Sequence, residues 1–303
     1  MKKAALFVTL VLIISEIHAQ SFYNFRRGRD IIATFGTGTS SYFGDLNNPG
    51  DIIDAKLNLN LGLQYYFTDR IAIRGEANYF RLSGDDAEAD SEGRVVRNLS
   101  FRSDNLELNV VGIIQAFSNG TRFYQRPPFN LYGFAGLGVL YFNPKGEVPV
   151  NGWGGASLDE SAGDFVALQP LQTEGVDYSR IAIVVPMGAG IKFKAGPFFN
   201  IGVEGSYRLT FTDYLDDVST TYLLHSSLSN EPLRQALADR RHELDGVFPP
   251  FGVEEGKKRG DPNDNDGYFL LNIRIEYYIP SHILSTSKAK YQRRKRYRKP
   301  RRR

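Results

Sequence analysis

The chain has 303 residues, of which 42% are hydrophobic and 23% are charged, and its formal net charge is +3. This composition excludes low-complexity disorder for most of the chain. The absence of cysteine excludes disulfides, thiolate metal sites, cysteine nucleophiles and a lipidated N-terminal cysteine.

The first residues are organised as a secretory signal peptide. Lys2 and Lys3 precede an apolar run over 4–14, and the small residue Ala19 stands at a cleavage position. We therefore expect residues 1–19 to be removed, with the mature chain beginning at Gln20. The run is shorter than the roughly 20 apolar residues that a membrane helix needs, and no later apolar run is longer. Any further membrane crossing must therefore use strands.

Residues 20–280 alternate between apolar and polar positions in eight segments. In 56–67 (KLNLNLGLQYYF) leucine and aromatic residues occupy every second position, which is typical of a two-faced strand of membrane-crossing length. Eight is an even number, as expected for a closed antiparallel transmembrane β-barrel. The segments are 31–43, 56–67, 71–82, 105–117, 129–142, 181–193, 198–211 and 268–279.

Short and long connections alternate between these segments. Residues 68–70 and 194–197 are hairpin turns and 118–128 is a modest connection, whereas 44–55, 83–104, 143–180 and 212–267 are long. Outer-membrane barrels have short periplasmic turns and long external loops, so we expect a cell outer-membrane protein with both termini in the periplasm. The alternative is a secreted β-sandwich, whose loops follow no such rule.

With the apolar face outward, the inward face carries equal numbers of basic and acidic residues. An eight-stranded barrel is just wide enough to be filled by side chains, so we expect a salt-bridged network and no selective channel. The network residues are Arg74, Glu76, Glu107, Lys192, Glu204, Arg208, Arg274 and Glu276. The outward aromatic residues should lie at the two membrane interfaces, and they are Tyr65, Phe67, Tyr79, Phe129, Tyr141, Phe199, Tyr207 and Tyr277.

Two segments of the last long loop have a recognisable character. Residues 231–244 (EPLRQALADRRHEL) favour a short helix. Residues 261–266 (DPNDND) form an acidic stretch whose spacing does not fit an EF-hand, so we expect a turn into the last strand and no metal site.

Enzyme motifs give no support for catalysis. No hydrolase elbow, zinc-protease helix or phosphate loop occurs, so we expect no enzyme and no cofactor. The only local alternative is a loop-assembled set of His225, Ser226 and Asp216.

Residues 281–303 form a basic C-terminal tail. From Lys288 onward it holds eleven Lys or Arg and no acid, whereas residues 20–287 carry 24 Lys or Arg against 33 Asp or Glu. Such a block binds polyanions or acidic protein faces. In the periplasm we expect an acidic protein, the anionic membrane or peptidoglycan as partner, and no nucleic acid. The partner-binding residues are predicted to be Arg293, Arg294, Lys295, Arg296, Arg298, Lys299, Arg301, Arg302 and Arg303.

Three further segments carry a family resemblance. They are 41–46 (SYFGDL), 212–222 (TDYLDDVSTTY) and 259–269 (RGDPNDNDGYF). Together with the barrel, they resemble a Bacteroidetes outer-membrane family that includes PorG of the type IX secretion system. One departure is Gly267, which stands where a tryptophan is expected.

The resemblance implies a non-enzymatic outer-membrane barrel of the protein secretion machinery, which anchors a periplasmic PorK/PorN-like ring. The basic tail would then dock on the ring or on peptidoglycan. The alternative is a free-standing small barrel, similar to OmpA or OmpW, for envelope stability, adhesion or passage of a hydrophobic ligand. Passage of a ligand would need a lateral gap, for which Pro186 is the candidate because it lacks a ladder donor.

Overall fold

A computed structural model describes residues 30–46, 56–89, 91–120, 123–150, 157–158, 162–223, 231–244 and 256–280. The predicted signal peptide and the basic tail lie outside these ranges. Eight long strands dominate the described part: β1 (Ile31–Phe43), β2 (Lys56–Tyr66), β3 (Ile71–Asp85), β4 (Ser100–Gln115), β5 (Phe129–Tyr141), β8 (Ile181–Lys194), β9 (Phe199–Thr210) and β10 (Gly267–Tyr278).

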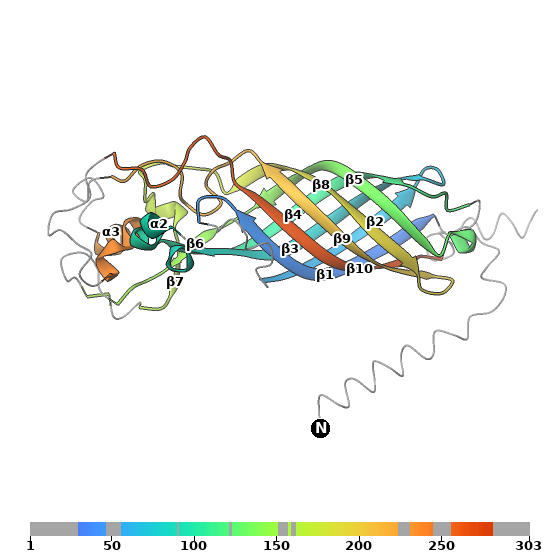
Figure 1. The fold of residues 1–303 in the computed structure, drawn as a ribbon, viewed down its shortest axis with the longest axis horizontal. Helices are drawn as coiled ribbons and strands as arrows, with labels where there is room; N and C mark the ends of the chain where they lie inside the picture. Colours follow the sequence, from blue (N-terminus) through green and yellow to red (C-terminus); the bar gives the residue numbers. More distant parts are fainter. Residues whose placement is uncertain are drawn as a thin grey trace, which may run out of the picture.

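The eight strands close into a barrel (Figure 1). Each is antiparallel to the next in chain order, and β1 pairs with β10 from Ile32 opposite Tyr278 to Phe43 opposite Gly267. The predicted fold class, an all-β eight-stranded antiparallel barrel, is confirmed. The predicted bounds differ most at the end of β3 and the start of β4, because this hairpin continues beyond the barrel, pairing as far as Asp85 opposite Ser100.

The outside of the barrel is apolar. On β2, Leu61 is 63% exposed and Leu63 is 58% exposed, while the intervening inward positions are buried. Such a continuous apolar surface requires a membrane around it. The predicted outward aromatic residues lie on this surface, five of them exposed. Phe199, Tyr207 and Tyr277 are half-buried because they contact one another or Phe43.

The described parts of the long connections fold into a cap at one end of the barrel (Figure 1). It contains β6 (Pro144–Glu147), which pairs with β4, and β7 (Phe165–Ala167), together with α2 (Glu92–Arg97), α3 (Pro232–Ala238), η3 (Asp86–Glu88), η7 (Gln169–Leu171) and η9 (Arg240–Glu243). The cap shares a buried apolar cluster with the barrel mouth, including Leu46, Phe80, Phe101, Phe142 and Leu215.

The predicted helix over 231–244 is divided into α3 and η9. Asp239 interrupts it in an extended conformation, and its carboxylate accepts a hydrogen bond from the Arg241 N–H. A side chain that hydrogen-bonds to a nearby backbone N–H competes with the hydrogen bonds of a continued helix, which explains the break. No helix within the described ranges is both long and apolar enough to cross a membrane.

The short turns lie at the opposite end, together with both ends of the described barrel. Ile279 N–H donates to Ile31 O at 2.9 Å, so the chain enters and leaves the barrel side by side. The predicted sorting of long and short connections to opposite ends therefore holds.

Candidate functional site

Charged side chains from five strands meet inside the barrel. All eight residues of the predicted lumen network face inward, and each is at most 6% exposed. They share the interior because alternate residues of a strand face the same side. The described lumen therefore contains a charged network beside buried apolar side chains such as Val111, Ile113 and Phe134, whereas the exterior is apolar.

Two arginines and two glutamates form the central cluster of the lumen. Arg74 Nη2 lies 2.9 Å from Glu204 Oε2, and its Nε lies 3.2 Å from Glu76 Oε1. Arg274 binds both glutamates as well, with Nη2 2.7 Å from Glu204 Oε1. Tyr132 donates its hydroxyl to Glu204 at 2.8 Å. Each glutamate is thus shared by two guanidinium groups, which neutralises all four charges locally.

Two smaller clusters flank the centre. Lys192 Nζ lies 3.2 Å from Glu276 Oε2, which also accepts a hydrogen bond from Asn200 at 2.7 Å. Arg208 Nε lies 3.3 Å from Glu107 Oε2, and this oxygen accepts the Tyr268 hydroxyl at 2.6 Å. An ion entering the lumen would have to separate these pairs. The arrangement is therefore a filled interior and not a single-sign selectivity ring.

One wall of the lumen keeps unsatisfied polar groups. Thr34, Asn60 and Gln64 on β1 and β2 are at most 2% exposed. Their side-chain oxygens and nitrogens have no hydrogen-bond partner among the described residues. Buried polar groups normally bind protein or ordered water. This wall is where internal water belongs.

The connection between β4 and β5 lies at the short-turn end. Its segment η4 (Phe123–Gln125) places Phe123 in a buried cluster with Ile32, Phe198 and Tyr278. The Arg126 guanidinium donates to Asn200 Oδ1 at 2.6 Å and to four backbone carbonyls, and lies 4.6 Å from the Tyr278 ring centroid. We call residues 123–126 the turn-end plug, because they pack against buried residues at the short-turn end of the barrel.

The three segments that carry the family resemblance meet in the cap. Tyr42 donates its hydroxyl to Asp266 Oδ1, and the Leu215 N–H donates to Asp266 Oδ2 at 2.8 Å. The Asp261 N–H donates to Asp45 Oδ2 at 2.8 Å, which joins the first segment to the third again. The second and third segments are joined by the Gly260 N–H and the Thr220 carbonyl at 3.0 Å.

A buried ion pair fixes the same segments to the connection before β8. Arg259 Nη1 lies 2.7 Å from Glu174 Oε1, and the carboxylate of Glu174 accepts the N–H groups of Ser219 and Thr220 at 3.1 and 2.9 Å. Although burial opposes ionisation, Arg259 and these donors hold the pKa of Glu174 below its usual range. We call the set Tyr42, Asp45, Glu174, Asp217, Arg259 and Asp266 the loop latch.

Asp213, beside the loop latch, and Asp217, within it, both have a raised pKa. Burial raises the pKa of Asp213 to about 7, against the opposing effect of the Ser219 side chain. Burial also raises the pKa of Asp217 to about 6, against the opposing effect of Arg259. Asp217 has φ of 70°, a left-handed conformation that its bonds from Thr173 and Tyr178 help to hold.

In the acidic stretch 261–266, the carboxylates of Asp261 and Asp266 accept hydrogen bonds from protein groups. Asp261 accepts from Lys258 Nζ and from the Asn263 N–H, while Asp266 belongs to the loop latch. Within the ranges that the structure describes, no group of three or more His, Cys, Asp or Glu is arranged to hold a metal ion.

Only one member of the catalytic alternative can be placed. His225 and Ser226 lie outside the described residues, whereas Asp216 is buried in the cap and accepts the Val218 N–H. His242 lies in η9, where its Nδ1 is 2.9 Å from the Asp239 carbonyl. The predicted partner-binding residues of the tail also lie outside the described ranges.

Pro186 interrupts one ladder of the barrel. The β5–β8 pairing stops after Ala135 opposite Met187 and resumes at Gly138 opposite Val184. On its other side, β8 stays paired with β9 across this position. Pro186 itself is buried on the inward side of β8, opposite Arg208 of β9.

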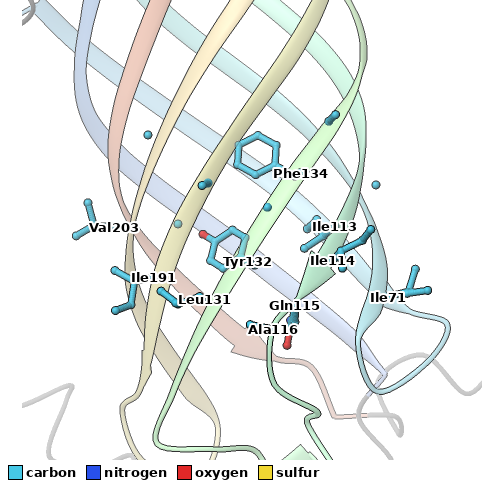
Figure 2. Close-up of a pocket in the computed structure, with 16 residues that line it drawn as sticks. Ile71, Ile113, Ile114, Gln115, Ala116, Leu131, Tyr132, Phe134, Ile191 and Val203 are labelled. Carbon is cyan, nitrogen blue, oxygen red and sulfur yellow. The ribbon is translucent and has the colours of Figure 1, made fainter.

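A shallow groove of about 1170 Å³ lies over β4, β5, β8 and β9 (Figure 2). Its floor on the membrane side consists of small outward residues: Gly112, Gly133, Ala135, Ala189 and Gly205. Behind the wall, Tyr132 and Phe134 lie against Gly190 and Gly188, where a Cβ would approach the rings to 2.6 and 2.8 Å. The groove is thus a consequence of packing large rings inside a narrow barrel.

Several residues of the site are held by contacts between segments far apart in the sequence, which sequence patterns do not reveal. No sequence pattern marks Tyr42, Glu174, Arg259 or Arg126 individually, although Tyr42 and Arg259 lie within the segments of the family resemblance. A cation and aromatic residues in the otherwise polar 118–128 connection were the available signal for the turn-end plug.

The sheet is closed, its exterior is apolar and the charges inside it are paired. These features define an eight-stranded outer-membrane β-barrel whose lumen is filled by its own side chains. No protein-family model and no curated protein matches the chain. Among solved structures, the chain is similar to Neisserial surface protein A (9% identity, TM-score 0.38), covering 82% of this chain and 97% of that one.

The outer-membrane protein OprG of Pseudomonas aeruginosa is similar at 13% identity and a TM-score of 0.38, covering 84% of this chain and 99% of OprG. A major outer-membrane protein of Thermus thermophilus is similar at 9% identity and a TM-score of 0.38, covering 82% of this chain and 98% of that one. We derive no function from similarities at this level.

Proposed function

We propose that the protein is a non-enzymatic barrel of the type IX secretion machinery, anchoring a periplasmic PorK/PorN-like ring beneath the outer membrane. The observation that carries this proposal is the loop latch. The three segments that resemble the PorG-containing family lie far apart in the sequence, yet they bind one another in a single buried network. Their residues therefore serve one structural unit, which supports a family-wide role for them.

The filled lumen supports an anchor over a channel. Its charges are paired at both flanks and in the centre, and the turn-end plug and the apolar cap cluster lie at its two ends. A closed barrel of this kind would give the periplasmic ring a fixed attachment point in the membrane. This role needs no molecule to pass through the lumen.

The basic tail supplies the contact in this proposal. The described barrel ends at the short-turn end, which we assign to the periplasm, and eleven positive charges follow within residues 288–303. The rest of the mature chain is acidic, so the tail adds a charge opposite to that of its own barrel. Contacts of this kind to a ring protein or peptidoglycan should weaken with salt.

A mild-detergent pull-down from the native envelope tests this assignment. Three tagged forms are compared: the full chain, a deletion of residues 288–303, and a form with every Lys and Arg of 288–303 changed to Gln. We expect only the full chain to recover ring subunits, because the Gln form keeps the tail length but not its charge. Equal recovery of ring subunits by all three forms would show that the tail does not make the contact. If the full chain recovered no ring subunits, the proposed secretion role would be wrong.

The second candidate is a free-standing envelope barrel or adhesin, and the folded cap favours it. The sheet continues beyond the barrel through β6 and β7, and Val95 and Val96 of α2 are each 38% exposed. Replacing 86–97 with a short Gly-Ser turn should then abolish cell adhesion while barrel folding persists. Passage of a hydrophobic ligand through the lumen finds less support, because the lumen is charged.

A further inference from the structure

Two cations lie opposite each other on the outer face of the sheet, where it continues above the barrel. Strands β5 and β6 pair with β4 in one continuous register, with Leu106 opposite Tyr141 and Arg102 opposite Lys145. Alternate residues of a strand face the same side. Arg102 and Lys145 are therefore on the same face as the outward Leu106 and Tyr141, and both are partly exposed.

Arg180 brings a third cation to this face. Its Nη1 lies 3.4 Å from Asn143 Oδ1, and its guanidinium lies 5.8 Å from the ring centroid of Tyr141. Asn143 stands midway between Tyr141 and Lys145 in the chain, about 7 Å from each along an extended backbone. We call Arg102, Lys145 and Arg180 the cation patch.

The cation patch has no acidic partner among the described residues. Like charges directly opposite on antiparallel strands repel each other, as Arg102 and Lys145 must. Asp104, the acid on the same face of β4, is already bound to Arg81, whose Nε lies 2.6 Å from Asp104 Oδ1. Glu147 is two residues farther from the barrel than Lys145 and forms no ion pair with the cation patch. The positive charge therefore remains available to an external anion.

Arg102 is held in place without the use of its N–H groups. Its Cζ lies 3.8 Å from the ring centroid of Phe165 in β7, and its Nε has no hydrogen-bond partner among the described residues. Stacking on a ring restricts a guanidinium while leaving its planar edge for a phosphate or carboxylate. The fixed geometry favours binding of an anion over a freely moving surface charge.

The height of the cation patch is that of lipid headgroups. Tyr141 is an outward aromatic residue at the cap end of its strand, and such residues mark the membrane interface. Arg102 follows four residues beyond Leu106, which is about 13 Å along the strand and about 10 Å along the membrane normal for a strand tilted by roughly 40°. Below it, Leu106, Leu108 and Val139 are exposed to the hydrocarbon.

We infer that the cation patch binds the phosphate monoester headgroup of a lipid in the leaflet at the cap end. The acyl chains would lie on the apolar surface below, against Leu106 and Leu108. A phosphate monoester carries about 1.5–2 negative charges at pH 7, so it matches several adjacent cations better than a singly charged phosphodiester or a zwitterion does. The inference depends on the barrel spanning a membrane and not on the secretion role.

Quenching of a single tryptophan by brominated lipid tests this site. In a Trp153→Phe background, which removes the only tryptophan, Leu106→Trp places the reporter below the cation patch. The control reporter is Leu209→Trp, because Leu209 is also outward at the cap end but lies on β9, with β5 and β8 between. The probes are vesicles with increasing fractions of brominated phosphatidic acid, phosphatidylglycerol or phosphatidylcholine. Heat-modifiable migration on a gel verifies that each variant folds.

At Leu106→Trp we expect half-maximal quenching at an about fivefold lower fraction of phosphatidic acid than of phosphatidylcholine, the effect of one cation near a headgroup, or at a still lower fraction. Phosphatidylglycerol should lie between the two, and Leu209→Trp should show a weaker preference. Changing both Arg102 and Lys145 to Gln should abolish the preference at Leu106→Trp. The charge-matched control, with Arg70 and Lys194 at the short-turn end changed to Gln, should keep it.

Three results would overturn the inference. The first is identical curves for phosphatidic acid and either other lipid at Leu106→Trp. The second is a preference that survives the loss of Arg102 and Lys145, or that is equal at both reporters. The third is loss of the preference when inorganic phosphate replaces chloride at equal ionic strength, because the site would then bind a free anion and not a lipid.

Discussion

Tyr42 in β1 donates its hydroxyl to Asp266 at the entrance of β10, across 224 residues of sequence. Both side chains are at most 2% exposed, so the bond is shielded from water. It connects the cap directly to the closing seam of the barrel between the first and last strands.

Tyr42→Phe should therefore loosen the cap while leaving the barrel closed. The change leaves Asp266 with one buried oxygen unsatisfied, which costs about 1–3 kcal/mol. Limited proteolysis of the folded protein should show faster cleavage in the cap and unchanged resistance of the barrel core. Tyr65→Phe is the control, because Tyr65 is exposed on the membrane face. Equal cleavage rates for the two variants would show that the loop latch does not hold the cap.

The stability of the cap should fall as pH rises. Burial raises the pKa of Asp213 to about 7 and that of Asp217 to about 6, each from an ordinary value of 3.8. A carboxyl group whose pKa is raised by folding makes its full contribution to stability when the pH is below its ordinary pKa. This contribution is lost as the pH rises through the raised pKa of the folded state. The lowered pKa of Glu174 acts in the opposite sense, but only below its ordinary value of 4.5.

Proteolysis of the cap at pH 5 and pH 8 measures this effect. Cleavage should be slower at pH 5, and Asp213→Asn should reduce the difference, because the amide stays neutral at both values. The comparison must use a protease whose own rate is calibrated at each pH with an unfolded substrate. A pH dependence that is unchanged in Asp213→Asn would assign it to other groups.

The barrel was predictable because its signal is local. A two-residue period fixes which side chains of a strand face the lumen, so the positions of Arg74, Glu204 and Arg274 follow from the sequence once the apolar face is set outward. The partners of these charges did not follow. Glu204 binds arginines from β3 and β10, and that choice depends on the curvature of a closed sheet.

The cap was not predictable for a related reason. Contacts such as Arg259 with Glu174 join segments 85 residues apart, and no periodicity marks them. The acidic composition of 261–266 is visible in the sequence, but it does not indicate that Asp266 turns inward to the loop latch. The division of 231–244 at Asp239 arises from one side chain that competes with the helix. Propensity summed over the segment does not detect it.

Removing one central carboxylate should destabilise the barrel more than removing a surface charge. Glu204→Gln leaves Arg74 and Arg274 to share Glu76 inside the lumen, and breaking a buried pair costs about 3–5 kcal/mol. Urea unfolding in lipid vesicles, followed by heat-modifiable migration, measures this loss. Glu92→Gln on α2 is the control, since Glu92 is exposed. A midpoint for Glu204→Gln equal to that of Glu92→Gln would contradict a structural role for the network.

Arg126 should hold the turn-end plug through the shape of its guanidinium as well as its charge. Its five acceptors lie around a planar fork that a lysine ammonium does not match. Both Arg126→Ala and Arg126→Lys should therefore expose the 118–128 connection to protease. Each variant should be destabilised by about 1.5–3 kcal/mol for a lost bond to a charged group.

The matched control is Lys194→Ala. Lys194 donates to the Tyr124 carbonyl at 2.7 Å, so it contacts the same connection. Its position is exposed, and such a bond contributes little to stability. We expect its cleavage rate to stay near that of the unmodified protein. If Arg126→Lys were as resistant as Lys194→Ala, charge alone would hold the plug, and the fork geometry would have no role. Because the central lumen charges stay paired in all of these variants, planar-bilayer recordings should show no steady conductance even when the plug is released.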